Sequence, residues 1–173
     1  MLVDETYRDF DSRTGAPHTL FTDPDWDDTL VQLYSFSKAY RLTGHRVGAI
    51  LTSPARLAQI EKWLDTVTIC PAQLGQHGAL WGMENLGDWL AGERREILAR
   101  RAAMASGLAD LPDWQALGCG AYFAYVRHPF DERSDALCRR LVADAGLLLL
   151  PGTMFGPTRE AGGSGRAEAT LRI

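Results

Sequence analysis

The chain has 173 residues, a hydrophobic content of 46%, a charged content of 23% and a formal net charge of −4. This composition is ordinary for a soluble globular protein with one domain, or with one domain and part of another. Acidic and basic residues are interspersed, which excludes both the basic face of a nucleic-acid-binding protein and the polybasic patch of a membrane-bound one. We therefore expect neither nucleic acid nor membrane as a partner.

We do not expect the first residues to be a secretory signal, because MLVDETYRDF is charged within its first four residues and so lacks the apolar core of such a leader. No apolar run reaches the roughly 18 residues of a membrane-spanning helix. The three cysteines, Cys70, Cys119 and Cys138, match neither a disulfide framework nor a zinc motif. We expect them to be buried free thiols in a reducing cytoplasm, and we expect no metal site.

The N-terminal half is expected to contain strands followed by a helix. Alternating apolar, β-branched and aromatic residues predict strands at Met1–Asp4, Thr29–Ser37 and Arg46–Pro54. Residues 8–28 are rich in Asp, Gly, Pro and Thr and indicate a loop. Ser53 caps a helix that begins at Pro54, whereas residues 75–87 are mixed and interrupted by glycines.

The C-terminal half is expected to open with a long helix, Trp89–Leu108, that buries one face. The residues predicted on that face are Trp89, Ile97, Met104 and Leu108. The elements expected beyond it are a strand at Ala121–His128, a helix from Ser134 closed by Gly146, a buried strand at Leu147–Gly152 and a last short strand ending at Ile173. The GGSG segment lacks a preceding strand and a following helix, so it is expected to be a flexible turn and not a phosphate loop. Alternation of strands and helices predicts the α/β class.

Lys38 is a candidate for chemistry because Lys38 and Lys62 are the only lysines among 18 basic residues. A lysine amine can lose its proton and attack a carbonyl carbon, which a guanidinium cannot do. Ser35 and Arg46 flank Lys38, and Gly44 allows a turn that brings Arg46 back. A hydroxyl and a guanidinium in these positions suit an anion such as a phosphate.

Asp4 and Tyr7 lie at the end of a different predicted strand. The carboxyl ends of neighbouring parallel strands are where ligands gather in such sheets. A carboxylate and a phenol beside a lysine, a hydroxyl and a guanidinium are the groups that pyridoxal 5'-phosphate requires.

The order and spacing of these residues resemble the class I/II aminotransferases, which are fold-type I pyridoxal-phosphate enzymes. A D-x-x-Y pair, in VDETYRDF, precedes S-x-S-K-x-x-x-x-x-G-x-R-x-G, in SFSKAYRLTGHRVG. The later segments CPAQLGQHGAL, GAYFAYV, LLLLPGTMFGP and TLRI also fit the family's pattern. The resemblance spans essentially the whole chain.

The resemblance implies pyridoxal 5'-phosphate as cofactor and assigns five residues to it. Lys38 matches the lysine that bonds covalently to the cofactor, and Asp4 the partner of its pyridine nitrogen. Tyr7 matches the tyrosine on its phenolic oxygen, whereas Ser35 and Arg46 match ligands of its phosphate.

Arg172 matches the family's arginine that binds the α-carboxylate of the substrate. The implied reaction is transfer of an amino group from an amino acid to a 2-oxo acid, in an enzyme that is a homodimer. Residues 1–88 are then part of the large cofactor-binding domain, at the end of its mixed sheet, and residues 89–173 are the linking long helix and the small C-terminal α/β domain. Such enzymes are usually well over twice this length, so we expect the chain to be the C-terminal part of one.

The segment around Lys38 also matches the motif of a different enzyme class. SFSK is also S-x-x-K, the motif of penicillin-binding proteins and class A β-lactamases, with Ser35 as nucleophile. That chemistry also needs S-D-N and K-T-G, and the chain has only SDA at Ser134 and EKW at Lys62, so it is excluded. A folded but inactive remnant, acting at most as an interaction module, and a pyridoxal-phosphate-dependent lyase on the same scaffold remain open.

The remaining polar and aromatic candidates have structural explanations. The sequence favours structural roles for His45, His77 and His128. It favours packing roles for Tyr40, Gln76 and Phe123.

Overall fold

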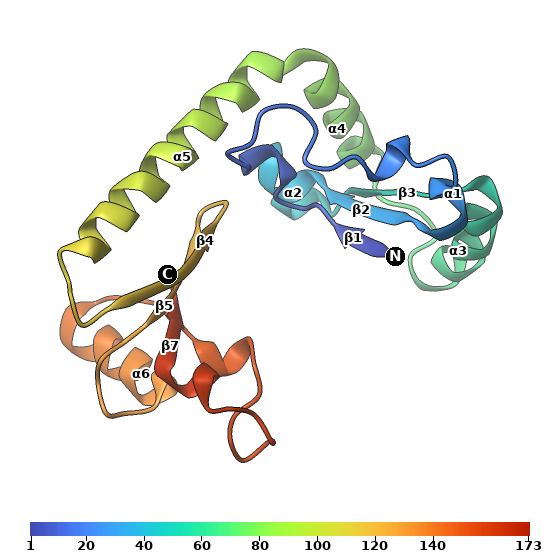
Figure 1. Ribbon diagram of the computed structural model, residues 1–173. Helices are drawn as coiled ribbons and strands as arrows, with labels where there is room; N and C mark the ends of the chain where they lie inside the picture. The colour runs from blue at the N-terminus through green and yellow to red at the C-terminus, as the bar shows by residue number, and fades with distance from the viewer. The chain divides into compact units, whose positions relative to one another are not determined.

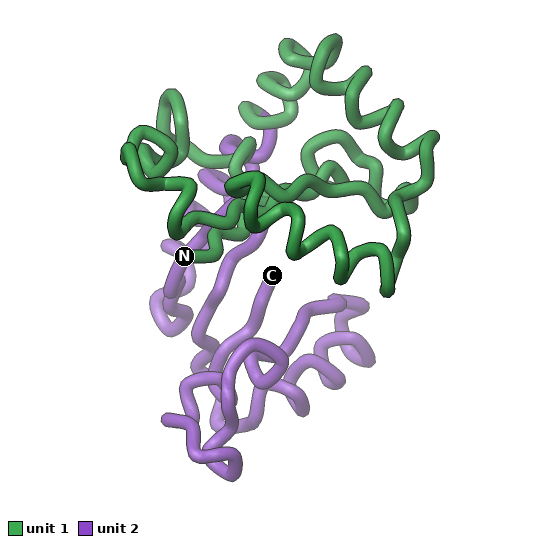
Figure 2. Tube along the Cα trace, turned by 90° about the vertical axis from the view of Figure 1, so that its right-hand side faces the viewer, with its two compact units in different colours: residues 1–95 green, residues 96–173 purple.

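The computed structural model describes residues 1–173 and divides them into two compact units, residues 1–95 and residues 96–173 (Figure 2). Each unit combines one sheet with helices, as the predicted α/β class requires. The functional domain boundary expected after residue 88 stays a prediction. None of the helices has the length and apolar character needed to cross a membrane.

The first unit is built on a mixed three-stranded sheet in the order β1-β2-β3 (Figure 1). Its strands are β1 (Leu2–Asp4), β2 (Val31–Ser35) and β3 (Gly48–Leu51). β1 runs parallel to β2, whereas β3 runs antiparallel to it. All three predicted strands exist, but the second and third are shorter than expected.

The predicted second strand was wrong beyond Ser35, because the chain turns there into a short helix. The Ser35 hydroxyl accepts a hydrogen bond from the main-chain N–H of Ser37 at 3.3 Å and caps α2 (Phe36–Ala39). The predicted third strand was wrong before Gly48, since Arg46 has a φ of 52° and lies in the left-handed region, which a strand does not use.

The first unit also contains seven complete helices, five of which are short. They are η1 (Arg8–Phe10), η2 (Leu20–Thr22), α1 (Trp26–Thr29), α2, η3 (Thr43–His45), α3 (Pro54–Val67) and α4 (Gln73–Asn85). α3 begins as predicted, with Pro54 in its first turn and the Ser53 hydroxyl accepting from the N–H of Arg56. α4 covers most of residues 75–87, where the mixed, glycine-interrupted pattern predicted no definite element.

The second unit contains an antiparallel four-stranded sheet in the order β4-β5-β7-β6. Its strands are β4 (Gln115–Gly120), β5 (Phe123–Arg127), β6 (Leu150–Pro151) and β7 (Thr170–Arg172). Its helices are α6 (Ser134–Ala145), η4 (Gly152–Met154) and η5 (Arg166–Ala169), and α5 (Gly87–Ala109) contains residues of both units. Gly146, with φ 65°, ends α6 as predicted.

The core of the second unit forms where the sheet meets its helices. Val126, Leu137 and Leu171 have no exposed surface. Leu108 of α5 packs against Ala124 and Val126. Of the face predicted for this long helix, only Leu108 is buried, while Trp89, Ile97 and Met104 are half-buried.

In the C-terminal half one strand was missed and another was predicted too long, and the expected burial of the cysteines was only partly right. The strand β4 was not predicted, because its six residues include Gly118 and Gly120, and glycine weakens a strand pattern. The buried strand Leu147–Gly152 shrinks to Leu150–Pro151, and Leu148 is 82% exposed. All cysteines are free thiols as expected, but Cys70 is exposed and only Cys138 is fully buried.

Candidate functional site

The first sheet brings four of the predicted site residues to one edge. In the parallel pair of β1 and β2, Asp4 lies opposite Leu33, and the N–H of Glu5 donates to the Leu33 carbonyl at 2.8 Å. In the antiparallel pair of β2 and β3, Ser35 lies opposite Gly48. The carboxyl ends of β1 and β2 therefore meet the amino end of β3, and Lys38 and Arg46 lie on the segment that connects β2 to β3.

Asp4 is the last residue of β1, and its carboxylate is exposed. Oδ1 accepts hydrogen bonds from Thr6 twice, from the hydroxyl at 2.6 Å and from the main-chain N–H at 3.0 Å. These two bonds hold the pKa of Asp4 below its usual value because they stabilise the charged form. Asp4 is therefore ionised at neutral pH, and Oδ2 remains available to an external donor.

Lys38 lies on α2, three residues beyond the end of β2 at Ser35, and its side chain is half-buried. It makes neither a hydrogen bond nor an ion pair within the protein. The segment that carries it is fixed, since the N–H of Phe36 donates to the Val47 carbonyl at 3.3 Å and the Thr43 hydroxyl donates to the Ser37 carbonyl at 3.1 Å. A fixed backbone with an uncommitted amine is suited to covalent chemistry at Nζ.

Arg46 is held in the left-handed region with φ 52° and ψ 47°, a conformation that costs a residue with a Cβ roughly 1 kcal/mol or more. Its Nη1 donates to the Thr43 carbonyl at 3.0 Å, and the rest of its exposed guanidinium is uncommitted. The turn expected at Gly44 is made differently, because the left-handed residues of this segment are Arg41 and Arg46. Gly44 lies inside η3 instead.

Tyr7 is half-buried and immediately precedes η1. The segment around it is fixed by a carboxylate that the sequence reasoning did not single out. Glu5 is 6% exposed, and it lies 3.1 Å from Arg8 Nη1 and 2.9 Å from His18 Nε2. Buried carboxylates need such partners, so Glu5 anchors the turn that carries Tyr7.

Asp9 and Thr6 are two further residues that the sequence reasoning missed. The Tyr34 hydroxyl donates to Asp9 Oδ2 at 2.6 Å, and burial together with this carboxylate raises the pKa of Tyr34. Thr6 donates both hydrogen bonds to the Asp4 carboxylate. This contact could have been predicted, because a threonine two residues after an aspartate is typical of turns closed by a side chain.

Arg172 belongs to the second unit, on β7, and is half-buried. Its Cζ lies 4.5 Å from the centroid of the Phe123 ring and 4.1 Å from that of Phe155. It makes no ion pair within the protein. Phe123, which the sequence analysis assigned to packing, thus contacts a predicted site residue.

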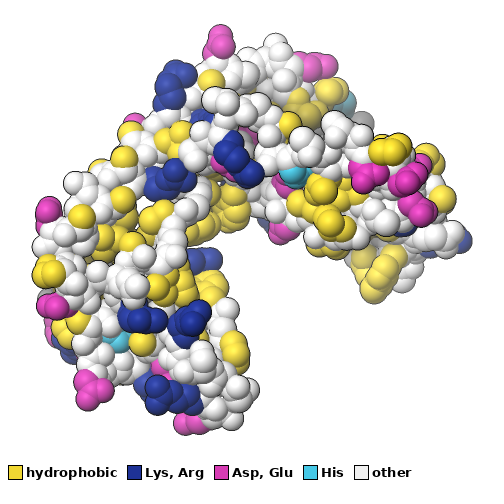
Figure 3. All heavy atoms as spheres, viewed as in Figure 1, with side chains coloured by type: hydrophobic (Ala, Val, Ile, Leu, Met, Phe, Trp, Pro, Cys, Tyr) yellow, Lys and Arg dark blue, Asp and Glu magenta, His cyan; other side chains and the backbone are white.

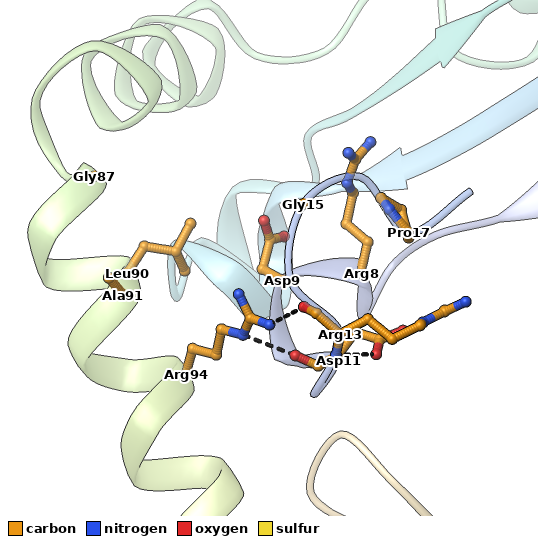
Figure 4. Close-up of a pocket in the computed structure, with 10 residues that line it drawn as sticks. All are labelled: Arg8, Asp9, Asp11, Arg13, Gly15, Pro17, Gly87, Leu90, Ala91 and Arg94. Carbon is orange, nitrogen blue, oxygen red and sulfur yellow. Dashed lines mark hydrogen bonds and ion pairs between the residues drawn. The ribbon is translucent and has the colours of Figure 1, made fainter. Parts of the chain in front are cut away.

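A charged pocket in the first unit contains none of the predicted site residues (Figure 4). Its walls come from the segment after β1 and from the first turns of α5. Its arginines serve the fold, since Arg94 donates to the main-chain carbonyls of Asp11 and Arg13, and Arg13 pairs with the Asp11 carboxylate. These bonds tie residues 11–13 to α5.

The whole chain, residues 1–173, matches the family model described as aminotransferase class I and II. The chain belongs to the class I/II aminotransferases. It is 30% identical to the valine–pyruvate aminotransferase of Mycobacterium tuberculosis, over 99% of this chain and 47% of that protein. It is 28% identical to an aromatic aminotransferase of Arabidopsis thaliana, over 90% of this chain and 40% of that protein.

The solved structures of aminotransferases share this fold. The structure of a probable N-succinyldiaminopimelate aminotransferase from Thermus thermophilus matches with a TM-score of 0.83 and 25% identity, over 99% of this chain and 44% of that one. The mixed α/β architecture of a fold-type I aminotransferase is thereby confirmed for this chain. The chain spans less than half the length of these relatives.

The sheet edge fits the cofactor that the family resemblance implies. Asp4 supplies an ionised carboxylate with one oxygen available, and Lys38 supplies an amine without a partner. The Ser35 hydroxyl and the Arg46 guanidinium supply donors to an anion, from either side of the same turn. The donor set is therefore the one that a phosphorylated pyridine aldehyde needs.

Proposed function

We propose that this chain provides the cofactor-attaching part of a pyridoxal 5'-phosphate-dependent aminotransferase that moves an amino group from an amino acid to a 2-oxo acid. The observation that supports it most is the register of the first sheet. In this register Asp4, at the end of β1, lies beside β2, which leads into Lys38. Ser35, at the end of β2, lies beside the start of β3, which follows Arg46.

Each residue at this edge has a role that follows from its chemistry. Lys38 holds the cofactor through Nζ, and Ser35 and Arg46 bind its phosphate. The Asp4 carboxylate, kept ionised by Thr6, holds a proton on the ring nitrogen. Tyr7 donates to the phenolic oxygen. When bound, the cofactor supplies an electron sink for the carbanion at the substrate's Cα.

Lys38 and Arg172 act on the substrate. The Lys38 amine, once free of the cofactor, takes the proton from Cα as a general base. Arg172 binds the α-carboxylate through its fork of N–H donors, which fixes the direction of the Cα–H bond. Asp4 acts on the cofactor's ring nitrogen and not on the substrate. Loss of its carboxylate should slow the chemistry more than it weakens cofactor binding.

The relatives suggest which donors to test. Valine, aromatic amino acids and aspartate occur in the names of related aminotransferases. The purified chain is incubated with pyridoxal 5'-phosphate, each donor and pyruvate, and release of the new 2-oxo acid is measured. We expect turnover with at least one donor and none for Lys38→Arg.

A second candidate function is cofactor binding without turnover. It is favoured by large exposed apolar side chains in the first unit, which belong to the hydrophobic surface coloured yellow in Figure 3. Trp63, Ile69, Leu74 and Trp81 are each more than half exposed, and such surfaces mark sites of association. Cofactor attachment at Lys38 with no 2-oxo acid from any donor would select this candidate.

A further inference from the structure

Two aromatic rings contact the Arg172 guanidinium, and they come from the segments on either side of its strand, β7. β7 lies between β5 and β6 in the second sheet. Tyr125 is directly opposite Arg172, so Phe123, two residues earlier on β5, is the diagonal neighbour on the same face. Phe155 follows η4, just beyond β6. The distances from the Arg172 Cζ to the two ring centroids, 4.5 Å and 4.1 Å, are well within cation–π range.

The two rings restrain the cation without occupying its donors. A ring face attracts a guanidinium but offers no lone pair to its in-plane N–H groups. Other arginines of this unit differ, since Arg133 pairs with Asp135 at 3.1 Å and Arg140 pairs with Glu132. Arg172 is thus held in place while its fork stays open to an anion.

Phe155 is the less obvious of the two rings as a packing residue. It is 45% exposed, so its burial adds little to the core of the unit. The distance from its ring centroid to the Arg172 Cζ is nevertheless the shortest among the cation–π pairs of the chain. The position of this exposed ring over an unpaired cation is better explained by its attraction for the Arg172 guanidinium than by packing.

We propose that Phe123 and Phe155 are positioning residues that hold the Arg172 guanidinium ready for the α-carboxylate of the substrate. This inference rests on the proposed function, in which Arg172 binds that carboxylate. A long arginine side chain that moves freely must lose rotamer freedom when it binds, and a restrained one loses less. The rings therefore raise the affinity for a carboxylate without touching it.

The test uses the Nε–Hε resonance of Arg172 in the ¹⁵N-labelled 173-residue protein. The probe is acetate, titrated at constant ionic strength against chloride, with acetamide as the uncharged control. The variants are Phe123→Leu and Phe155→Leu, and Phe155→Tyr is the conservative replacement. Phe130→Leu is the matched control, because Phe130 is 44% exposed and its ring covers Arg140 at 5.3 Å in the same unit.

In the unchanged protein, ring currents should shift the Arg172 Hε upfield, and acetate but not acetamide should move it. Each Leu variant should lose the part of the upfield shift that its own ring causes and bind acetate about three-fold more weakly, the size expected from one cation–π contact. Phe155→Tyr should restore both properties, and Phe130→Leu should change neither. The backbone amide spectrum of each variant reports whether it is folded.

Two results would overturn the inference, and they differ. If both Leu variants bind acetate as the unchanged protein does, the rings do not position Arg172, and its role toward carboxylates is untouched. If acetate moves no Arg172 resonance even in the unchanged protein, the carboxylate role proposed for Arg172 fails, and the positioning role fails with it.

Discussion

Gly82 of α4 lies directly against the ring of Tyr40, and a Cβ added at Gly82 would be 2.8 Å from Tyr40 Cδ1. Tyr40 follows Lys38 by two residues and packs on Phe36, with ring centroids 5.8 Å apart. Gly75 makes a similar approach, since its added Cβ would be 3.0 Å from the His45 carbonyl oxygen. The segment between Lys38 and Arg46 is therefore supported by the glycine face of α4.

Gly82→Ala should destabilise the protein and disturb this segment. The added methyl has no space, and overpacking of this kind costs about 1–3 kcal/mol. Gly78→Ala is the control on the same helix, because its Cβ would meet only Leu42 at 3.8 Å, and alanine in place of helical glycine stabilises by up to about 1 kcal/mol. Urea unfolding of both variants measures the difference, and equal free energies of unfolding would contradict the packing described.

This helix also shows where sequence reasoning fell short. No helix was predicted for residues 75–87, because glycines interrupt the segment and glycine has low helix propensity. The structure spaces Gly75, Ala79 and Gly82 along one buried face of α4, so close approach to the Lys38–Arg46 segment outweighs the lost propensity. That packing is a tertiary effect and leaves no local sequence signal.

Other parts of the fold and site were predictable because their causes are local or follow from a general rule of sheet topology. The helix from Pro54 and the end of α6 at Gly146 follow from a capping serine, a first-turn proline and a left-handed glycine. The edge that unites Asp4, Ser35, Lys38 and Arg46 followed from the rule that parallel strands end together. Asp9 was missed because its partner, Tyr34, is 25 residues away in the sequence. Glu5 was missed because its burial depends on His18 as well as on the nearby Arg8.

Thr6→Val should raise the pKa of Asp4. The hydroxyl of Thr6 is the largest cause of the lowered pKa, and valine keeps only the main-chain hydrogen bond. Because the folded pKa of Asp4 lies below its ordinary value of 3.8, its contribution to stability is present above that value and is lost as the pH falls through the folded pKa. The variant should therefore lose less stability on acidification.

A titration followed by the carboxyl ¹³C shift of Asp4 measures this pKa directly. Thr6→Ser keeps a hydroxyl and should match the unchanged protein. An Asp4 pKa that is the same in the valine and serine variants would show that the hydroxyl does not act on this carboxylate.

His128 should make the second unit sensitive to mild acid. It is 4% exposed and stacks on Phe130, with ring centroids 6.1 Å apart. Burial lowers the pKa of His128 below its ordinary value of 6.5, and the nearby main chain of Glu168 and Phe130 offsets this only partly. As the pH falls below 6.5, the unfolded chain takes up a proton that the folded protein resists, so stability should decline there.

His128→Phe should remove that part of the pH dependence, since an apolar ring fits the same buried stack. His77, which is exposed, provides the control variant His77→Asn, and this substitution should leave the pH profile unchanged. The free energy of unfolding is measured in urea from neutral pH downward. A profile for His128→Phe that matches the unchanged protein would show that another group controls the acid sensitivity.

The central claim is that the first sheet builds a site for covalent attachment of pyridoxal 5'-phosphate at Lys38. The two lysines provide their own comparison, because Lys62 is on the exposed surface of α3, where Nζ donates to Gln59 at 3.0 Å. The chain is titrated with pyridoxal 5'-phosphate, reduced with borohydride and digested, and the labelled lysine is mapped by mass spectrometry. We expect saturable labelling of Lys38 that is weakened by Arg46→Gln and unaffected by Lys62→Arg. Weak labelling of Lys38 and Lys62 to the same extent, without saturation, would contradict the account.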